Sequence, residues 1–321
     1  MYHILENIVY KDKKFYCETI EEPLEIKLVR NASIIIEPLL SPLAIEEEYE
    51  CCILHKRGVK SGYFHILMEE LFSIHYCQKG FNLKPEFVFN IENLELEFNH
   101  KLNQKNYNWE EWLNNFINCP IKKESDKTIK FKKVILGWKT INGISIDINK
   151  TNKQFIFRSF SNSILLKHGI EQKNNTNKIL FDIRDKRFPR NLTNITELKN
   201  ELKEFNIEFV DFASMNIKDQ IQKVSGASIF ISQHGAGLCN LVFMKEGSVV
   251  IEIGPKNHEY QVYNQIAKLF NIKYIKHEEL ESNCKYNGNS DIEKIRIRDQ
   301  DITVNIDKLK KIIYEILAAE A

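Results

Sequence analysis

The second half of the chain alternates short apolar runs with amphipathic stretches. Apolar runs rich in β-branched and aromatic residues predict strands, and they lie at 178–183, 207–212, 228–233, 248–253 and 273–277. Apolar residues at helical spacing predict helices between them, at 194–205, 216–227, 237–244 and 258–271. Because this alternation is typical of βαβ units, it predicts a Rossmann-like domain with a parallel sheet.

The first half is less regular. Short apolar runs predict strands at 33–37, 51–54 and 86–90, near 131–136 and near 155–160, and apolar spacing predicts helices at 61–76 and 105–118. The polar stretch 171–177 has no periodicity and predicts a linker. We therefore expect an α/β domain with a β-rich margin at 1–170 and the Rossmann-like domain at 171–321.

The chain closes with an apolar stripe at helical spacing over 306–321. The stripe consists of Leu309, Ile312, Ile313, Ile316 and Leu317. It predicts a helix that packs on the protein's own core, and a helix that lies on a membrane surface is the alternative.

Composition excludes several classes of protein. The 321 residues carry a formal net charge of +1, which argues against a nucleic-acid partner bound through bulk charge. No apolar run approaches the roughly 18 residues that span a membrane, and the first twenty residues lack a secretory signal pattern. The seven cysteines are scattered without a C-x-x-C pair, so we expect reduced thiols and a cytoplasmic protein.

The sequence His234-Gly235-Ala236-Gly237 directly follows the strand predicted at 228–233. Glycine at such a corner lets the backbone approach a ligand closely and adopt a positive φ. The first turn of the following helix directs free N–H groups, and the positive end of the helix dipole, to the same place. The corner therefore suits an anion such as phosphate, but a tight strand-to-helix connection would use the same residues.

The corner is part of a longer motif, HGAGLCNLVF at 234–243, which is followed by GSVVIEI at 247–253. Upstream, Arg184 ends a predicted strand, and Arg190 stands four residues before Asn194. These motifs resemble those of glycosyltransferase family 61, which holds bacterial capsule-type transferases, plant xylosyltransferases and animal O-linked N-acetylglucosamine transferases.

Three further matches to the family pattern are less specific. Gln220 matches a glutamine in the helix before the HGAG strand. Asn194 matches an asparagine, but with Glu197 three residues later it also fits a helix N-cap with a capping box. In the first half, His65 with Glu69 four residues later matches a helical histidine–acid motif.

The resemblance implies a GT-B-like fold, in which two Rossmann-like domains with parallel sheets face a central cleft. It implies an inverting transfer of a sugar from a nucleotide-sugar donor, UDP by resemblance alone, to a hydroxyl of a glycan or glycolipid acceptor. It implies no cofactor and no divalent metal, and it suggests synthesis of a surface polysaccharide such as a bacterial capsule. The alternatives are an inactive nucleotide- or carbohydrate-binding module of the same fold, or a nucleotide-sugar epimerase.

Without a metal, fixed cations must stabilise the charge that develops on the donor's β-phosphate. Arg184 and Arg190 suit this role because a guanidinium can bind phosphate through two hydrogen bonds. The alternative for each is an ion pair with Asp182 or Asp185, and Arg187 is a substitute candidate.

The corner and the next strand supply the other donor-binding residues that the resemblance implies. They are His234, Gly235, Ala236, Gly237, Leu238, Asn240 and Glu252. His234 could contact phosphate or hold the turn, and for Asn240 a structural role is the expectation. Glu252 could accept hydrogen bonds from the ribose hydroxyls or form a salt bridge.

An inverting transfer also needs a base for the acceptor hydroxyl. On an α-helix His65 and Glu69 share one face, so Glu69 as base with His65 orienting it is one assignment, and His65 as base is the other. The competing interpretation is a surface acid beside a histidine whose hydrogen bonds are satisfied within the protein. The only Asp-x-Asp pair, Asp299 and Asp301, is expected to be a solvated turn and not a metal motif.

Overall fold

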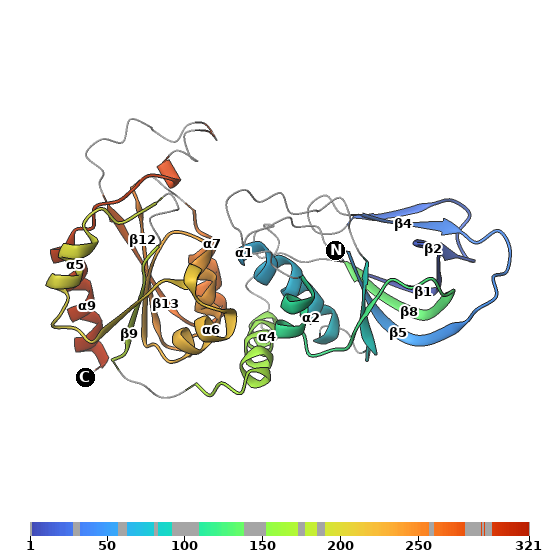
Figure 1. The fold of residues 1–321 in the computed structure, drawn as a ribbon, viewed down its shortest axis with the longest axis horizontal. Coiled ribbons are helices and arrows are strands. Elements are labelled where there is room, and N and C mark those ends of the chain that lie inside the picture. Colours follow the sequence, from blue (N-terminus) through green and yellow to red (C-terminus); the bar gives the residue numbers. More distant parts are fainter. Residues whose placement is uncertain are drawn as a thin grey trace. The chain divides into compact units, whose positions relative to one another are not determined.

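The computed structural model describes residues 2–27, 33–56, 63–79, 83–91, 109–137, 152–172, 177–184, 190–256, 260–279, 290, 292 and 297–320. The chain divides into two compact units, Met1–Lys167 and His168–Ala321 (Figure 1). Each unit has its own sheet and its own core. The fold is therefore of the α/β class that the sequence predicts.

The C-terminal unit contains a parallel five-stranded sheet in the order β10-β9-β11-β12-β13. Its strands are β9 (Ile179–Asp182), β10 (Ile207–Val210), β11 (Ile229–Gln233), β12 (Val249–Pro255) and β13 (Lys273–Glu279). All five overlap predicted strands. The order is that of a doubly wound sheet whose strand sequence reverses between the first and third strands, here β9 and β11.

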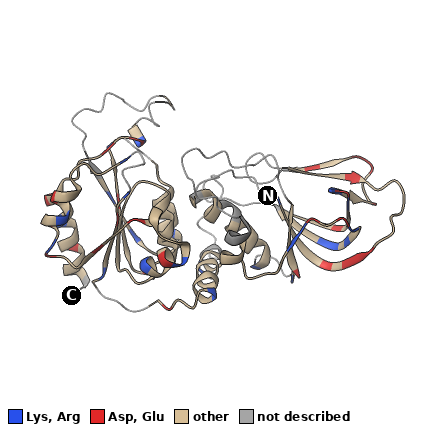
Figure 2. Ribbon diagram, in the orientation of Figure 1, with Lys and Arg blue, Asp and Glu red and all other residues tan. Residues whose placement is uncertain are grey.

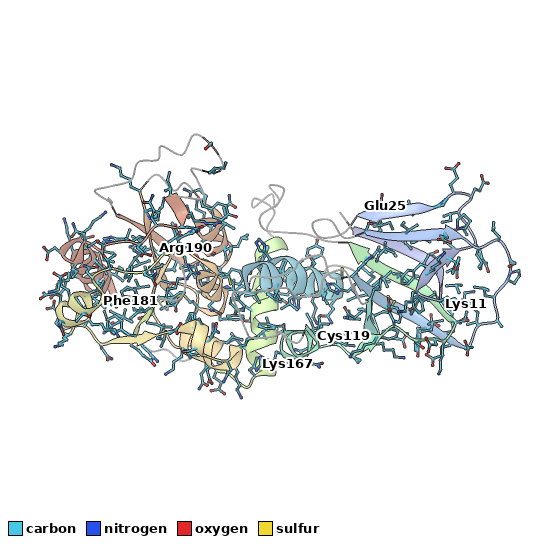
Figure 3. The ribbon with its side chains drawn as sticks, turned by 45° about the horizontal axis from the view of Figure 1, so that its top comes forward. Lys11, Glu25, Cys119, Lys167, Phe181 and Arg190 are labelled. Carbon is cyan, nitrogen blue, oxygen red and sulfur yellow. The ribbon has the colours of Figure 1, made fainter. Side chains whose placement is uncertain are left out.

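Helices cover both faces of this sheet. Figure 1 shows α5 (Ile195–Glu201) and α9 (Ile306–Glu320) on one face, and α6 (Ile217–Ser225) and α7 (Val262–Leu269) on the other. The core on the α5 and α9 side contains Phe181, which is labelled in Figure 3.

The apolar stripe of α9 is part of the protein's own core. Leu309, Ile313 and Ile316 are buried in one cluster with Leu198 and Leu202 of the α5 region. The prediction that this stripe packs internally is therefore confirmed.

The capping box predicted at Asn194 is wrong. Asn194 does stand at the N-cap position of α5, but its side chain makes no cap hydrogen bond there. Its amide instead donates to the carbonyl of Val304 (2.9 Å) and accepts from the amide of Val304 (3.0 Å). The side chain thus joins two distant segments, which a local pattern could not reveal.

The N-terminal unit is built on a mixed sheet in the order β3-β4-β2-β1-β8-β5-β6-β7. Its strands are β1 (Tyr2–Lys11), β2 (Lys14–Cys17), β3 (Leu24–Lys27), β4 (Ser33–Pro38), β5 (Glu47–Lys56), β6 (Phe87–Ile91), β7 (Ile121–Lys123) and β8 (Ile129–Gly137). β8, β5, β6 and β7 run parallel, whereas β1 pairs antiparallel with both β2 and β8. This unit is Rossmann-like only in its parallel half.

The helices of this unit are α1 (Tyr63–His65), the π-helix η1 (Ile66–Leu71), α2 (Phe72–Lys79), α3 (Trp109–Phe116) and α4 (Asn152–Lys167). α2 packs on β5 and β8, and α4 packs on α2 and α3. The strand predicted near 155–160 is wrong, because this stretch lies in α4. Phe157 and Phe160 are buried while Phe155 is 74% exposed, so the apolar positions follow a helical period and not alternation.

Charge is dispersed over both units. Figure 2 shows acidic and basic side chains interspersed on helices and strands, in keeping with the net charge of +1. Among the helices that the structure describes, none is long and apolar enough to cross a bilayer. The cysteines within the described ranges, Cys17, Cys51, Cys52, Cys77, Cys119 and Cys239, are free thiols.

Candidate active site

The candidate site lies at the carboxyl edge of the C-terminal sheet, where the strand order reverses. β9 ends at Asp182 and β11 ends at Gln233, and Arg184 and His234 follow these two strands. In open α/β sheets the crevice outside these strand ends is where ligands bind.

Two arginines meet over the backbone of Gly235. A Cβ atom on this glycine would lie 3.4 Å from both terminal nitrogens of Arg184 and 3.5 Å from Nη1 of Arg190. Burial lowers the pKa of Arg184. Burial, followed by the neighbouring charge of Arg184, lowers the pKa of Arg190 to about 10. Two partly desolvated like charges at one place favour an anion as their partner.

The glycines of the corner serve close approach and not a left-handed backbone. The φ of Gly235 is 162°, which is extended backbone, so the predicted positive φ is wrong at this position. At Gly237 a Cβ atom would lie 2.7 Å from Oδ2 of Asp182. A side chain at Gly237 would therefore displace the carboxyl group of Asp182, whereas a Cβ atom at Gly235 would lie in van der Waals contact with the two guanidinium groups.

Ala236 and the residues after it form the 3₁₀-helix η4 (Ala236–Phe243), where the sequence suggests an α-helix. Bonds of the i to i+3 type, such as Leu238 N–H to the Gly235 carbonyl (3.0 Å), tighten it. Leu238 is fully buried, so this residue belongs to the core, and Ala236 accepts a hydrogen bond from the Cys239 thiol on its carbonyl.

Asp182, the last residue of β9, carries a carboxyl group that interacts electrostatically with Arg184. It accepts hydrogen bonds from Ser232 Oγ (3.0 Å) and the Phe212 amide (3.2 Å). Burial raises its pKa to about 6, and the two hydrogen bonds oppose the rise. The charge of Arg184 also lowers the pKa of Asp182, so the pairing of Arg184 with Asp182 that the sequence allowed stays a prediction.

Arg190 is held by its backbone as well as by its side chain. Its φ is 72°, an uncommon value for a residue other than glycine. Gln233 Nε2 donates to its carbonyl, and its own Nη1 donates to the carbonyl of His234 (2.9 Å). Strained backbone of this kind concentrates at functional sites.

His234 belongs to a buried polar chain that crosses three strands. Its Nδ1 lies 2.5 Å from Oε1 of Glu252 on β12, and Tyr274 on β13 donates to Oε2 of the same carboxyl group (2.7 Å). The side chains of His234 and Glu252 are 6% and 1% exposed. Tyr260 and Tyr263 pack edge-on against the imidazole, with ring centroids 5.7 and 5.5 Å away. Because the carboxyl group accepts from Nδ1, that nitrogen carries the proton.

Asn240 and Gln220 contact each other. The Asn240 amide donates to Oε1 of Gln220 (3.2 Å), and Nε2 of Gln220 donates to the carbonyls of Phe212 (2.8 Å) and Met215 (3.2 Å). These bonds tie η4 to α6 and to the 3₁₀-helix η3 (Phe212–Ser214).

The sequence interpretation gave Asp299 no part in the site. Asp299 does lie in a turn, and its side chain is 30% exposed, but its carboxyl group accepts two hydrogen bonds of 2.8 Å from Arg298 and lies 3.5 Å from Nε of Arg190. The hydrogen bonds from Arg298 hold its pKa below the usual value. Tyr274 was also missed, since an aromatic residue in a predicted strand carries no functional signal.

The residues proposed for catalysis lie in the N-terminal unit. His65 ends α1, and Glu69 lies in the π-helix η1, to which the i, i+4 spacing of an α-helix does not apply. π-helical turns occur frequently at functional sites. The side chain of Glu69 lies outside the described part of the chain, as do Asp185 and Arg187. In the described ranges there is no group of three or more His, Cys, Asp or Glu side chains that could hold a metal ion.

The parallel doubly wound sheet, with two arginines at a glycine corner of its switch point, defines an α/β protein with a candidate anion-binding site. Residues 63–251 match the family model described as Glycosyltransferase 61. The chain therefore belongs to glycosyltransferase family 61, a family of transferase enzymes, and the resemblance seen in the motifs is confirmed.

The chain is also similar to named animal enzymes. It is 30% identical over 128 residues to the EGF domain-specific O-linked N-acetylglucosamine transferase of Bos taurus. It is 31% identical over 128 residues to the proteins of the same name from Rattus norvegicus and Mus musculus. Each alignment covers 37% of this chain and 24% of the relative, so the chain spans about a quarter of the length of the curated relatives it matches.

Proposed function

We propose that the protein is an inverting, metal-independent glycosyltransferase that moves a sugar from a UDP-linked donor to a hydroxyl of a glycan or glycolipid acceptor. The observation that carries the proposal is the convergence of Arg184 and Arg190 on Gly235 at the switch point of the C-terminal sheet. Membership of family 61 supports the reaction class. UDP as the nucleotide rests on the family resemblance.

In the proposed reaction, the acceptor oxygen attacks the anomeric carbon from the face opposite the leaving group. The bond between that carbon and the diphosphate oxygen breaks, and its electron pair stays on the β-phosphate. Arg184 and Arg190 would stabilise this charge, because charge-assisted bonds from guanidinium to phosphate are about twice as strong as neutral ones. Attack from the opposite face inverts the configuration at the anomeric carbon.

The acceptor hydroxyl loses its proton to a base. We assign this role to Glu69, with His65 orienting it, and keep His65 as the alternative base. The π-helix that contains Glu69 directly follows the short helix that His65 ends, so both residues lie on one continuous helical segment. No step of the proposal requires a divalent metal.

Next to the arginines, the backbone of Gly235, Ala236 and Gly237 would form the floor of the site, which contacts the donor, and His234 would lie beside the phosphates. Leu238 and Asn240 would support this floor from the interior. Glu252 would act by orienting His234, since both of its carboxyl oxygens already accept hydrogen bonds. The role of Glu252 as a contact to the ribose stays a prediction.

We place the enzyme in the cytoplasm, in the synthesis of a surface polysaccharide, with peripheral membrane association where the acceptor is a glycolipid. The relatives are named for the transfer of N-acetylglucosamine, so UDP-N-acetylglucosamine is the first donor to test.

The test is the release of free UDP, measured with and without acceptor. A transferase releases UDP in proportion to acceptor, a binding module releases none, and an epimerase converts the donor without releasing UDP. A thermal-shift screen against UDP-, GDP- and CMP-sugars identifies the donor, because a ligand at 100 times its Kd stabilises the fold by about 2.7 kcal/mol. A donor that stabilises the protein without acceptor-dependent UDP release would overturn the transferase proposal.

A further inference from the structure

We infer that Asp299 and Asp301 are positioning residues that together hold Arg190 at the phosphate site, and we name this pair the aspartate clamp. The identity of the anion rests on the proposed function, but the clamp itself is a feature of the protein's contacts. The pair is the Asp-x-Asp motif for which the sequence offered only a solvated turn or a metal.

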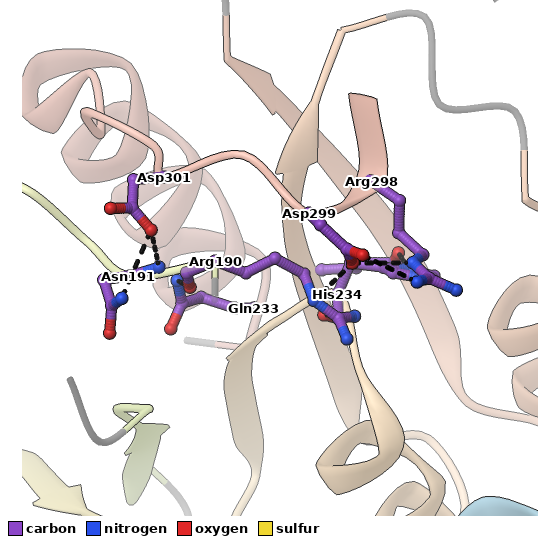
Figure 4. Close-up of polar contacts among 8 residues, drawn as sticks. Arg190, Asn191, Gln233, His234, Arg298, Asp299 and Asp301 are labelled. Atoms are coloured by element: carbon purple, nitrogen blue, oxygen red, sulfur yellow. Dashed lines mark hydrogen bonds and ion pairs between the residues drawn. The ribbon is translucent and has the colours of Figure 1, made fainter. Parts of the chain in front are cut away.

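Asp301 holds the backbone next to Arg190. Its Oδ1 accepts from the Asn191 amide at 2.6 Å and from the Asn191 side chain at 3.2 Å (Figure 4). The contact continues along both segments, because Leu192 and Ile302 form a parallel bridge. The Ile302 amide donates to the Asn191 carbonyl at 2.8 Å. A segment 110 residues later in the chain thus fixes the path of the loop that carries the arginine.

Asp299 holds the guanidinium. Its Oδ1 lies 3.5 Å from Nε of Arg190, while Arg298 binds the same carboxyl group with two bonds of 2.8 Å (Figure 4). The Arg190 side chain is only 15% exposed. On the far side of the guanidinium, Nη1 donates to the His234 carbonyl at 2.9 Å. The side chain is therefore fixed from two directions.

The backbone of Arg190 explains why a clamp is needed. A φ of 72° is unfavourable for a residue with a Cβ atom, and such conformations persist only where surrounding contacts determine them. Arg190 must also lie near a second buried cation, Arg184, which repels it. Backbone strain and charge repulsion both oppose this position, and Asp301 and Asp299 respectively offset them.

These contacts differ from those expected of a metal motif. Asp299 is paired with two guanidinium groups, and Asp301 accepts from a backbone amide and a side-chain amide. The aspartates act on the donor through Arg190, so their effect depends on that residue. This dependence is what an experiment can measure.

The first experiment needs no ligand. Hydrogen exchange of the Asn191 amide is measured in the full chain for the wild type, Asp301→Ala and Asp301→Asn. We expect at least a tenfold faster exchange in Asp301→Ala and an intermediate rate in Asp301→Asn. Asp307→Ala, which removes an acid from the first turn of α9, is the matched control and should leave the rate unchanged. Unchanged exchange in both Asp301 variants overturns the clamp, whether or not the protein binds UDP.

The second experiment is a double-mutant cycle on UDP affinity, with Asp299→Ala, Arg190→Ala and the double variant. A carboxyl group that is merely near a phosphate repels it, so its removal would tighten binding. A positioning carboxyl group predicts the opposite sign. We expect about tenfold weaker binding for Asp299→Ala, with no further loss when it is added to Arg190→Ala.

Unchanged or tighter UDP binding in Asp299→Ala, in a protein whose unfolding temperature matches the wild type, overturns the inference. If Asp299→Ala does not fold, Asp299→Asn keeps the shape of the side chain and takes its place in the cycle. UDP binding that requires Mn²⁺ in the wild type, together with loss of Mn²⁺ binding in Asp299→Ala, would make the pair a metal site and also overturn it. If the wild type binds no UDP, the proposed function fails, while the exchange experiment still decides the clamp.

Discussion

The imidazole of His234 and the carboxyl group of Glu252 form a buried pair, with Nδ1 and Oε1 2.5 Å apart. Both side chains are almost fully enclosed, and Tyr274 donates to the other oxygen of Glu252. The pair fixes the rotation of the ring and assigns the proton to Nδ1. His234 immediately precedes Gly235, so the orientation of the ring is set one residue away from the two arginines.

We predict that Glu252→Gln changes the tautomer of His234. Glutamate has two acceptor oxygens, whereas glutamine has one acceptor oxygen and one NH₂ group that donates. Glutamine therefore cannot accept hydrogen bonds from His234 and Tyr274 through two separate oxygens. Nitrogen-15 NMR of the imidazole should report the loss of the Nδ1–H···O bond. The free energy of unfolding should fall by about 1–3 kcal/mol, as for other buried groups that lose a partner. Tyr274→Phe should keep the tautomer, and identical imidazole spectra for Glu252→Gln and wild type would contradict the assignment.

Arg190→Ala should weaken UDP binding by more than tenfold. The variant removes a charge-assisted contact to phosphate, and Arg184 alone cannot replace it. Arg190→Lys keeps the charge but loses the planar fork, so it should bind with intermediate affinity. Calorimetric titration of UDP into the three proteins measures the effect, and an unchanged Kd for Arg190→Ala would place the donor elsewhere.

Gly237→Ala should destabilise the C-terminal unit. The new Cβ atom would lie 2.7 Å from Oδ2 of Asp182, so the buried carboxyl group or η4 must move. Overpacking of this kind typically costs about 1–3 kcal/mol. Chemical denaturation measures the loss, and Gly226→Ala is a control because Gly226 has a φ of −94° and a Cβ atom there would make its closest contact at 3.7 Å. A Gly237→Ala protein as stable as the wild type would show that the corner tolerates a side chain.

Glu69→Gln should lower kcat without changing the Kd for UDP. The substitution keeps the shape and removes the base, and a positioned base contributes about 10²–10⁴-fold in rate. His65→Ala should lower kcat less if His65 only orients Glu69, and at least as much if His65 is the base. A Glu69→Gln enzyme that keeps more than a tenth of the wild-type kcat would remove Glu69 from the mechanism.

Activity should survive EDTA. The proposal assigns the stabilisation of the leaving diphosphate to arginines, so removing divalent ions should leave the rate unchanged. The measurement is UDP release before and after chelation, with added Mn²⁺ or Mg²⁺ as the complementary arm. Activity that is lost with EDTA and restored by metal would contradict the proposal and make Asp299 and Asp301 candidate metal ligands.

The sheet of the C-terminal unit could be predicted from the sequence because the pattern that predicts each strand lies within that strand and the stretches next to it. Each strand is a short apolar run between amphipathic stretches. A strand of a parallel sheet that is buried on both faces has a nearly continuous apolar sequence, so such a run identifies it. The stretch 155–160 was predicted incorrectly because a short aromatic run fits a strand and a buried helix equally well. Only the contacts of Phe157 and Phe160 with the rest of the unit decide between them.

The site was predictable only in part, because some of its residues stand in sequence motifs and others are brought to it only by the fold. Arg184, Arg190 and His234 stand in recognisable motifs, and the structure brings all three to Gly235. Tyr274, Arg298 and Asp299 reach the same region through the fold, and although Asp299 stands in an Asp-x-Asp pair, nothing in the sequence links this pair to Arg190. The glycines were expected to allow close approach to a ligand and a positive φ, whereas Gly235 has an extended backbone and Gly237 leaves room for the carboxyl group of Asp182.

The contact between Asp301 and Asn191 also has a consequence for biosynthesis. The loop with Arg190 is made before its partner segment at 299–303, which follows all five strands of the C-terminal sheet. Chains are made from the N-terminus at about 5–20 residues per second, so the five strands are synthesised before the segment that completes the candidate site. A ribosome-bound chain that has all five strands but not this segment would therefore lack the contacts that hold Arg190.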